Sequence, residues 1–134
     1  KTILFLLTIL FCAFSYSQVK YDQIIKSKYV AFYEWSYSKD TYLETGADWL
    51  DMTLDPNKDY YKIEIGNDGD VEKVWWEYQG KEEGDDGDDY YTEDGRKIYF
   101  NYEKQEIWFF YDYNQSKNRY ESLMVASKLT AYDK

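Results

Sequence analysis

Few of the side chains that carry out enzyme or metal chemistry occur in this chain. It contains no His, and its single Cys, Cys12, lies within an apolar run near the N-terminus. Zinc and transition-metal sites usually need His or Cys ligands, and Ser-His or Cys-His nucleophiles need an imidazole base. No Walker or G-x-G-x-x-G phosphate-binding pattern is present. We therefore predict a non-enzymatic protein and assign it no catalytic residues, no cofactor and no metal ligands.

Carboxylates are the remaining groups that could do chemistry. The segment 80–89 concentrates six of them: Glu82, Glu83, Asp85, Asp86, Asp88 and Asp89. Carboxylate oxygens suit calcium, and a facing pair of carboxylates can cleave a glycosidic bond. The segment lacks the spacing of an EF-hand loop, however, and like charges at this density favour a solvated loop. Calcium binding by 80–89 and a carboxylate-dependent hydrolase stay as alternatives.

Aromatic residues are the unusual feature of the composition. They make up 22% of the chain and include 17 Tyr and 5 Trp. Doublets such as Tyr60-Tyr61, Trp75-Trp76 and Tyr90-Tyr91 place one ring on each face of a strand, because strand side chains alternate. One face can then form the core while the other presents rings. Those rings could bind a ligand, form half-exposed cross-strand pairs, or be covered by the N-terminal residues.

The spacing of turns and apolar residues predicts an all-β fold, an antiparallel meander of about seven or eight strands that forms a small barrel or a sandwich. Asp68-Gly69 and Asp94-Gly95 favour two-residue hairpin turns, because both central positions need positive φ. Further turns are expected at Glu103-Lys104 and over 114–118. Apolar residues at helical spacing predict a short N-terminal helix over Val19–Lys28.

These turns set the cross-strand registers and therefore the core. The turn at Asp68-Gly69 places Tyr61 opposite Trp76, and the loop 114–118 places Phe109 opposite Leu123. Because a slip of one residue would exchange the two faces, the agreement among the turns supports the assignment. The predicted core face comprises Tyr61, Ile63, Ile65, Val74, Trp76, Tyr78, Ile98, Phe100, Ile107, Phe109, Tyr111, Leu123 and Val125.

On the opposite face the same registers predict a row of rings. Tyr90, Tyr99 and Trp108 fall opposite one another on three neighbouring strands, and Met124 extends the row. Strands lie about 4.8 Å apart, so the rings would form a platform for a sugar face or for a partner's side chains. Trp75 shares this face in a different hairpin. We predict Tyr90, Tyr99, Trp108 and Trp75 as ligand-binding residues, with a glycan or a protein as the partner.

The first seventeen residues are typical of a signal peptide. Lys1 precedes an apolar run over 3–14, and Ser15 and Ser17 fit the small-residue positions of a cleavage site before Gln18. The run is short for a membrane span. We therefore expect a protein exported by a bacterium to the periplasm or the outside, with a cleaved signal peptide over 1–17 and a single β-rich domain over 18–134.

Charge limits the partners of that domain. The chain carries 16 basic and 26 acidic residues, a net charge of -10, and removing Lys1 with the signal peptide makes it more negative still. Nucleic acids and anionic membrane surfaces attract Lys and Arg, so neither is an expected partner. The predicted mature chain has no Cys, so no disulfide supports its fold.

In layout, the succession of short hairpins after an N-terminal helical turn resembles lipocalin-like domains. The Gly-x-Trp of the first lipocalin strand is replaced here by Tyr33-Glu34-Trp35, so neither a ligand nor binding residues are carried over. The resemblance implies an alternative function, the carriage of a small apolar ligand inside the barrel. The first expectation is a small exported binding protein that uses an exposed aromatic face.

Overall fold

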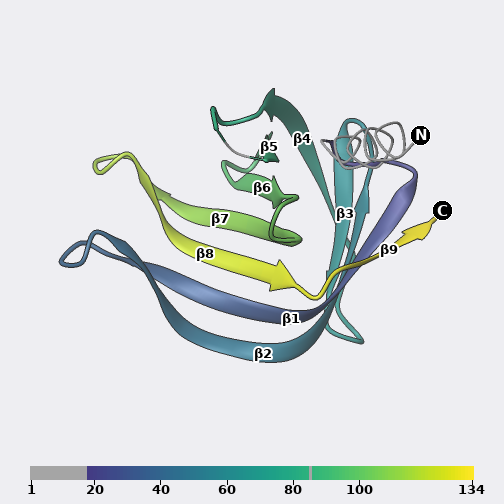
Figure 1. The fold of residues 1–134 in the computed structure, drawn as a ribbon, viewed down its shortest axis with the longest axis horizontal. Coiled ribbons are helices and arrows are strands. Elements are labelled where there is room, and N and C mark those ends of the chain that lie inside the picture. The colour runs from purple at the N-terminus through teal and green to yellow at the C-terminus, as the bar shows by residue number, and fades with distance from the viewer. Residues whose placement is uncertain (1–17, 85) are drawn as a thin grey trace, which may run out of the picture.

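A computed structural model describes residues 18–84 and 86–134, and the predicted signal peptide lies outside them. The described residues form nine strands and no helix (Figure 1). The strands are β1 (Gln23–Ser36), β2 (Thr41–Pro56), β3 (Tyr60–Ile65), β4 (Glu72–Gly80), β5 (Gly87–Thr92), β6 (Lys97–Asn101), β7 (Glu106–Asn114), β8 (Arg119–Ser127) and β9 (Thr130–Asp133).

Consecutive strands from β1 to β8 pair antiparallel in one meander, and the sheet closes into a ring because β1 also pairs with β8. The short β9 continues past the end of β8 and pairs with the start of β1. The β1–β2 and β7–β8 hairpins extend together to the left of Figure 1 and curve in the same direction. The all-β antiparallel meander is thus confirmed, and its closure makes it a barrel rather than two separate sheets.

The helix expected over Val19–Lys28 is wrong. Residues 21 and 22 form a turn, and β1 begins at Gln23. The backbone of 23–26 pairs with β9, and that of 25–27 pairs with β2. Long-range pairing on both sides, helped by the β-branched Ile24 and Ile25, therefore outweighs the helical spacing. Val19 instead packs into the core.

Turn chemistry shifts the β5–β6 register by one residue from the predicted one. The Gly95 amide donates to the Thr92 carbonyl at 3.1 Å, and the Thr92 amide donates to the Arg96 carbonyl at 2.9 Å. With Gly95 at a φ of 82°, this is a three-residue loop with a glycine bulge rather than a two-residue turn. Tyr90 consequently pairs with Ile98, on the core face.

A similar slip occurs in the β7–β8 hairpin. The loop spans 115–118, one residue shorter than predicted, and Phe109 pairs with Met124 instead of Leu123. Met124 and Ala126 therefore join the core, while Leu123 and Val125 belong to the other face. The β3–β4 connection is longer than predicted, but its shift of two residues leaves both faces unchanged.

Rings fill the centre of the core. Trp76 stacks on Tyr90 with centroids 4.2 Å apart and also contacts Tyr61 at 5.0 Å and Phe100 at 6.0 Å. The indole N–H of Trp76 donates to the Asn57 carbonyl at 2.8 Å. Predicted core residues confirmed in this cluster are Tyr61, Ile63, Val74, Trp76, Ile98, Phe100, Ile107 and Phe109. Ile65 and Tyr78, in contrast, are exposed.

The acidic loop is shorter than the predicted segment 80–89, because β5 begins at Gly87. Asp88 is fully buried, and its two oxygens accept hydrogen bonds from the phenols of Tyr78 at 3.0 Å and Tyr102 at 2.9 Å. Burial raises the pKa of the Asp88 carboxyl, although both phenols act in the opposite direction. Asp89 lies 3.7 Å from the Lys97 ammonium. Two of the six carboxylates thus belong to a strand.

Candidate functional site

The structure brings together two of the four predicted site residues. Tyr99 and Trp108 pair across β6 and β7, as predicted, with ring centroids 5.6 Å apart and edge to face. Tyr90 is only 2% exposed, so its place in an exposed row is wrong, because the glycine bulge turns it inward. Met124 also points to the core, and Val125 takes the place opposite Trp108.

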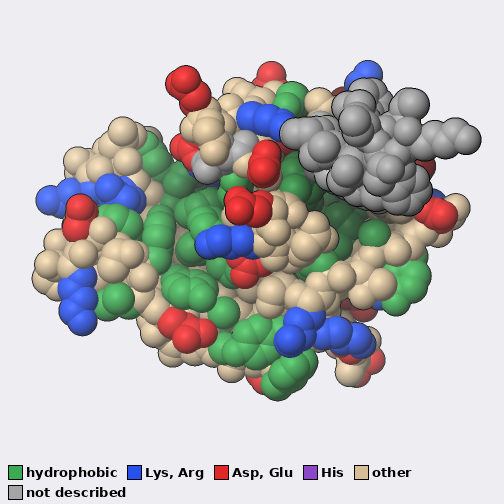
Figure 2. Space-filling view, in the orientation of Figure 1, with side chains coloured by type: hydrophobic (Ala, Val, Ile, Leu, Met, Phe, Trp, Pro, Cys, Tyr) green, Lys and Arg blue, Asp and Glu red, His purple; other side chains and the backbone are tan. Residues whose placement is uncertain are grey.

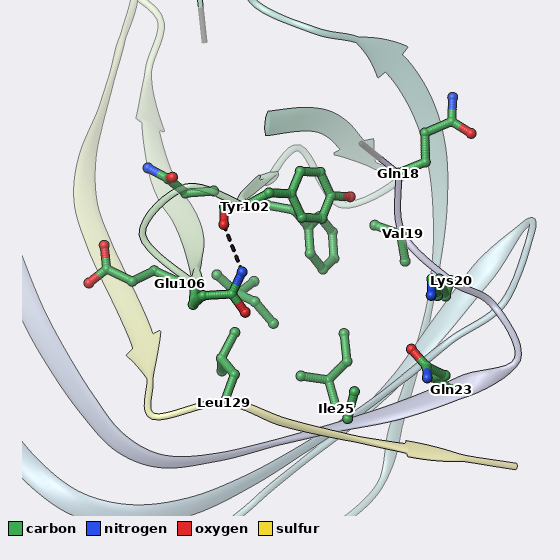
Figure 3. Close-up of a pocket in the computed structure, with 13 residues that line it drawn as sticks. Gln18, Val19, Lys20, Gln23, Ile25, Tyr102, Glu106 and Leu129 are labelled. Atoms are coloured by element: carbon green, nitrogen blue, oxygen red, sulfur yellow. Dashed lines mark hydrogen bonds between the residues drawn. The ribbon is translucent and has the colours of Figure 1, made fainter. Parts of the chain in front are cut away.

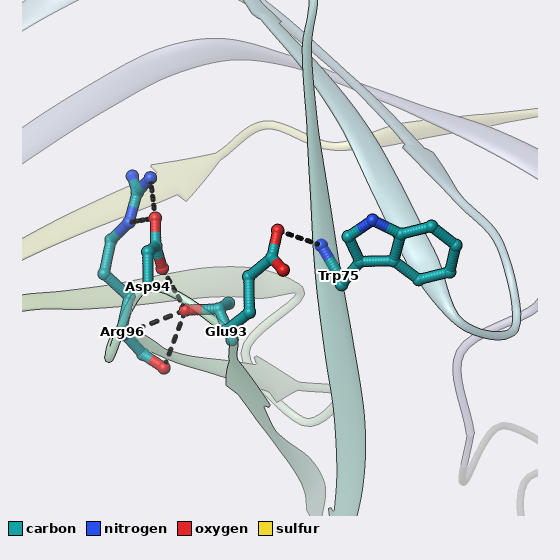
Figure 4. Close-up of polar contacts among 5 residues, drawn as sticks. Trp75, Glu93, Asp94 and Arg96 are labelled. Atoms are coloured by element: carbon teal, nitrogen blue, oxygen red, sulfur yellow. Dashed lines mark hydrogen bonds and ion pairs between the residues drawn. The ribbon is translucent and has the colours of Figure 1, made fainter.

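Trp75 belongs to a separate cluster on β3 and β4. It is 47% exposed, and its ring meets that of Tyr60 edge to face at 5.4 Å. The Lys73 ammonium lies 4.1 Å from the Tyr60 ring centroid and 4.9 Å from that of Trp75. The backbone amide of Trp75 donates to the Glu93 carboxylate at 3.4 Å (Figure 4). Glu93 belongs to the β5–β6 turn, in which Arg96 also pairs with Asp94. Trp75 therefore forms a local cross-strand pair apart from Trp108.

Rings continue from Trp108 along the face turned away from the core. Trp108 and Phe110 alternate with the core residues of β7, and their centroids are 6.2 Å apart. Phe110 contacts Tyr42 at 6.0 Å, and Tyr42 contacts Trp35 at 4.9 Å. We call this series the aromatic track, which comprises Tyr99, Trp108, Phe110, Tyr42 and Trp35.

The track lies on a curved part of the sheet. Tyr42 on β2 reaches Phe110 on β7 although β8 and β1 lie between them in the sheet. The Tyr42 phenol also donates to the Tyr120 carbonyl on β8 at 2.6 Å. Leu123, which pairs with Phe110 across β7 and β8, is only 4% exposed, although it is outside the core cluster. Figure 2 shows apolar side chains gathered in the left half of the view, where the long β1–β2 and β7–β8 hairpins lie in Figure 1.

A hollow of about 230 Å³ opens at the Trp108 end of the track. Its apolar wall consists of Tyr99, Trp108 and Phe110. The Lys104 ammonium lies 5.8 Å from the Trp108 ring centroid, and the Lys97 ammonium lies 5.1 Å from that of Phe110. The polar lining residues are Glu82, Asp86, Lys97, Asn101, Glu103 and Lys104. The site can therefore contact an apolar surface and exchange hydrogen bonds with polar groups at the same time.

Gly87 allows β5 to approach this site closely. A Cβ atom at this position would lie 2.4 Å from the Phe100 carbonyl oxygen and 2.4 Å from the Tyr99 ring. Only glycine therefore fits between them. The contact leaves Tyr99 only 7% exposed, and the preceding residue, Asp86, accepts a hydrogen bond from the Tyr102 amide at 2.9 Å. Tyr99 thus forms the floor of the hollow rather than an open platform.

Sequence reasoning missed Tyr42 and Trp35 as site residues. Aromatic residues alternate over 29–37, a pattern that predicts a strand but does not show whether Trp35 lies on its core face or its outer face. Tyr42 lies where 38–48 reads as a polar loop, yet β2 begins at Thr41. Their meeting with Phe110 depends on the curvature of the sheet, for which the sequence carries no local signal.

The interior of the ring leaves a second, smaller hollow at one end (Figure 3). Its volume is about 190 Å³, and side chains from the N-terminal residues, the β6–β7 turn and the β8–β9 connection line it. The apolar lining residues are Val19, Ile25, Phe100, Ile107, Leu129 and Ala131. The rim carries the side-chain amides of Gln18, Gln23, Asn101 and Gln105.

Two carboxylates meet at a single hydroxyl. The Ser122 hydroxyl lies 3.1 Å from a Glu34 oxygen and 3.0 Å from an Asp112 oxygen. Both carboxylates belong to exposed residues. Across 18–84 and 86–134 no group of three or more His, Cys, Asp or Glu residues could hold a metal ion.

Comparison with other proteins adds no identification. No family model, curated protein or solved structure matches this chain. Within the part of the chain that the structure describes, no helix is long and apolar enough to cross a membrane. Function is therefore inferred from the chemistry of the aromatic track and its hollow.

Proposed function

We propose that this protein is an exported, non-enzymatic binding protein that holds a glycan against the aromatic track. The observation that carries this proposal is the hollow beside Trp108, where three rings share a wall with carboxylate, amide and ammonium groups. A sugar ring presents an apolar C–H face and a rim of hydroxyls, and such a mixed site is complementary to both. Export is supported by the signal-peptide features of 1–17.

The size of the hollow favours a single sugar unit. Pockets for drug-sized ligands usually measure about 300–1,000 Å³, and this hollow is smaller. The Asp86 and Glu103 carboxylates could accept hydrogen bonds from hydroxyls, and the Lys104 ammonium could donate one. Further units would continue along Phe110 toward Tyr42.

Replacing Trp108 by Ala tests this proposal. Trp108 lies outside the core cluster, so the melting temperature should change little. Truncation of a central aromatic contact typically costs about 2 kcal/mol of binding, so affinity should fall roughly thirtyfold. A glycan array identifies a bound sugar, and titration calorimetry with that sugar compares the variants.

Trp75→Ala is the matched control, because it removes another indole that is not buried, from outside the track. Its affinity should equal that of the wild type. The proposal fails if the wild-type protein binds no sugar on the array, or if Trp108→Ala binds as tightly as Trp75→Ala does.

A second candidate function, the carriage of a small apolar molecule, is supported by the hollow at the end of the ring. An apolar cavity of about 150 Å³ is large enough to bind benzene, and this one is slightly larger. The amides at its rim could hydrogen-bond a neutral polar end group. A molecule with one ring and one hydroxyl, such as benzyl alcohol, fits both properties.

Filling that hollow tests the second candidate. Ala131→Phe should occupy the space and abolish the chemical-shift changes that benzyl alcohol causes in amide NMR spectra of residues around it. Thr130→Phe adds the same ring to the opposite face of β9 and should leave those changes intact. An absence of shift changes in the wild-type protein would exclude the hollow as a ligand site.

A further inference from the structure

Arg119 lies at the end of the aromatic track remote from the hollow. Its guanidinium carbon is 3.6 Å from the ring centroid of Trp35, the last ring in the series. This short distance means that the guanidinium lies against the indole face. Stacking restricts the plane of the guanidinium and leaves its N–H edge free to donate hydrogen bonds. Arg119 is thus held in an orientation suited to an anion that presents two neighbouring oxygens.

No carboxylate among residues 18–84 and 86–134 forms an ion pair with Arg119. The chain has only one other arginine, Arg96, whose Nε donates to Asp94 at 2.7 Å. Among the residues that the structure describes, no ion pair engages Arg119. The carboxylate of Glu121, two residues away, instead accepts hydrogen bonds from the Tyr37 phenol at 2.6 Å and the Asn114 amide at 2.8 Å.

Further cations lie over two rings of the track and over the nearby Tyr37. The ammonium of Lys104 lies over Trp108, and that of Lys97 lies over Phe110. Lys117, in the loop beside Arg119, lies 5.7 Å from the Tyr37 ring centroid. Figure 2 shows basic side chains at the tips of the two long hairpins, beside the apolar surface. Positive charges therefore lie beside several of these rings, although Lys97 also pairs with Asp89 and the hollow carries carboxylates as well.

The spacing of the rings suits an extended ligand. Successive centroids from Tyr99 to Trp35 are 4.9 to 6.2 Å apart, steps comparable in size to one sugar unit. A glycan that begins in the hollow would therefore reach Arg119 only after several units. A single sugar would leave the arginine unused.

From this geometry we infer that the track recognises an acidic oligosaccharide, whose carboxylate or sulfate group Arg119 binds through two parallel hydrogen bonds. This inference rests on the proposed glycan binding and adds the class of glycan. Bidentate contacts of this kind are a property of arginine that lysine lacks. The net charge of the protein opposes an anion only weakly at this site, because physiological salt screens exposed charges beyond about 8 Å.

Two matched pairs of oligosaccharides test the inference. The hexamer of galacturonic acid is compared with its methyl ester, and a sulfated galactan hexasaccharide is compared with its desulfated form. By titration calorimetry the wild type should bind at least one acidic member about ten- to a hundredfold more tightly than its neutral counterpart, as expected for a charge-assisted hydrogen-bonded pair. The pair that shows this difference identifies the anion as carboxylate or sulfate.

Variants of Arg119 then locate the effect. Arg119→Gln should lose the preference for the acidic member while binding the neutral one as before. Arg119→Lys keeps the charge but not the fork, so it should lose most of the preference as well. Lys39→Gln removes a cation from the tip of the neighbouring hairpin and should change neither affinity. Melting temperatures confirm that each variant is folded.

Two results would overturn the inference. One is equal affinity of the wild type for the acidic and neutral members of both pairs, which leaves the proposed glycan binding intact. The other is an acidic preference that Arg119→Gln and Arg119→Lys both retain, which would place the anion elsewhere. Absence of any glycan binding is a different outcome, because it removes the proposed function together with the inference.

Discussion

Replacing Trp76 by Ala should lower the free energy of unfolding by about 3–5 kcal/mol, the usual loss when a buried Trp is truncated. Trp76 lies at the centre of the ring, where it contacts Tyr61, Tyr90 and Phe100. The substitution leaves a cavity and also removes the indole donor from the Asn57 carbonyl. Since a domain of this kind is stable by only about 5–15 kcal/mol, the variant should melt far lower or fail to fold.

The neighbouring indole provides the control. Trp75 is on the same strand, but its side chain is half exposed and its ring contact is with Tyr60 on the surface. Trp75→Ala should therefore cost about 1 kcal/mol or less. Urea unfolding followed by circular dichroism measures both variants. Equal losses at the two positions would show that the assignment of the two faces of β4 is incorrect.

Alkaline pH should unfold this protein through its buried tyrosines. Burial raises the pKa of Tyr61 to about 12 and raises the pKa values of Tyr90 and Tyr102 as well. An unfolded tyrosine ionises near pH 10, so above that pH the unfolded chain releases protons that the folded chain retains. The stability contributed by these neutral phenols is complete below pH 10 and is lost as pH rises through the folded pKa values.

The size of this effect approaches the whole stability of a small domain. The rise in the pKa of Tyr61 from about 10 to about 12 corresponds to roughly 2.7 kcal/mol, and Tyr90 and Tyr102 add to it. We expect cooperative unfolding between about pH 10 and 12, with a jump in phenolate absorbance at the same pH as the loss of the circular dichroism signal.

Tyr61→Phe is the informative variant for this prediction. It retains the buried ring but removes one ionisable group, so the alkaline midpoint should move to higher pH. A gradual phenolate titration near the ordinary pKa of tyrosine, with the circular dichroism unchanged, would contradict the burial of these phenols. A midpoint that Tyr61→Phe leaves unchanged would assign the alkaline transition to other groups.

The sequence by itself determined the fold class and much of the core. Alternation along a strand depends only on the chain's own order, so residues such as Ile98, Phe100, Ile107 and Phe109 are identified without any tertiary information. The turn between β6 and β7 was also predicted with its register, and with it the facing pair of Tyr99 and Trp108.

Tertiary structure decided which face of a strand some residues occupy, because adding or removing one residue in a turn exchanges the two faces of the next strand. The glycine bulge at Gly95 places Tyr90 in the core, and the shorter loop before Arg119 does the same for Met124. The path of the aromatic track was undetermined for a different reason. Tyr42 and Phe110 meet because the closed sheet curves across four strands, and that curvature is a property of the whole ring rather than of any segment.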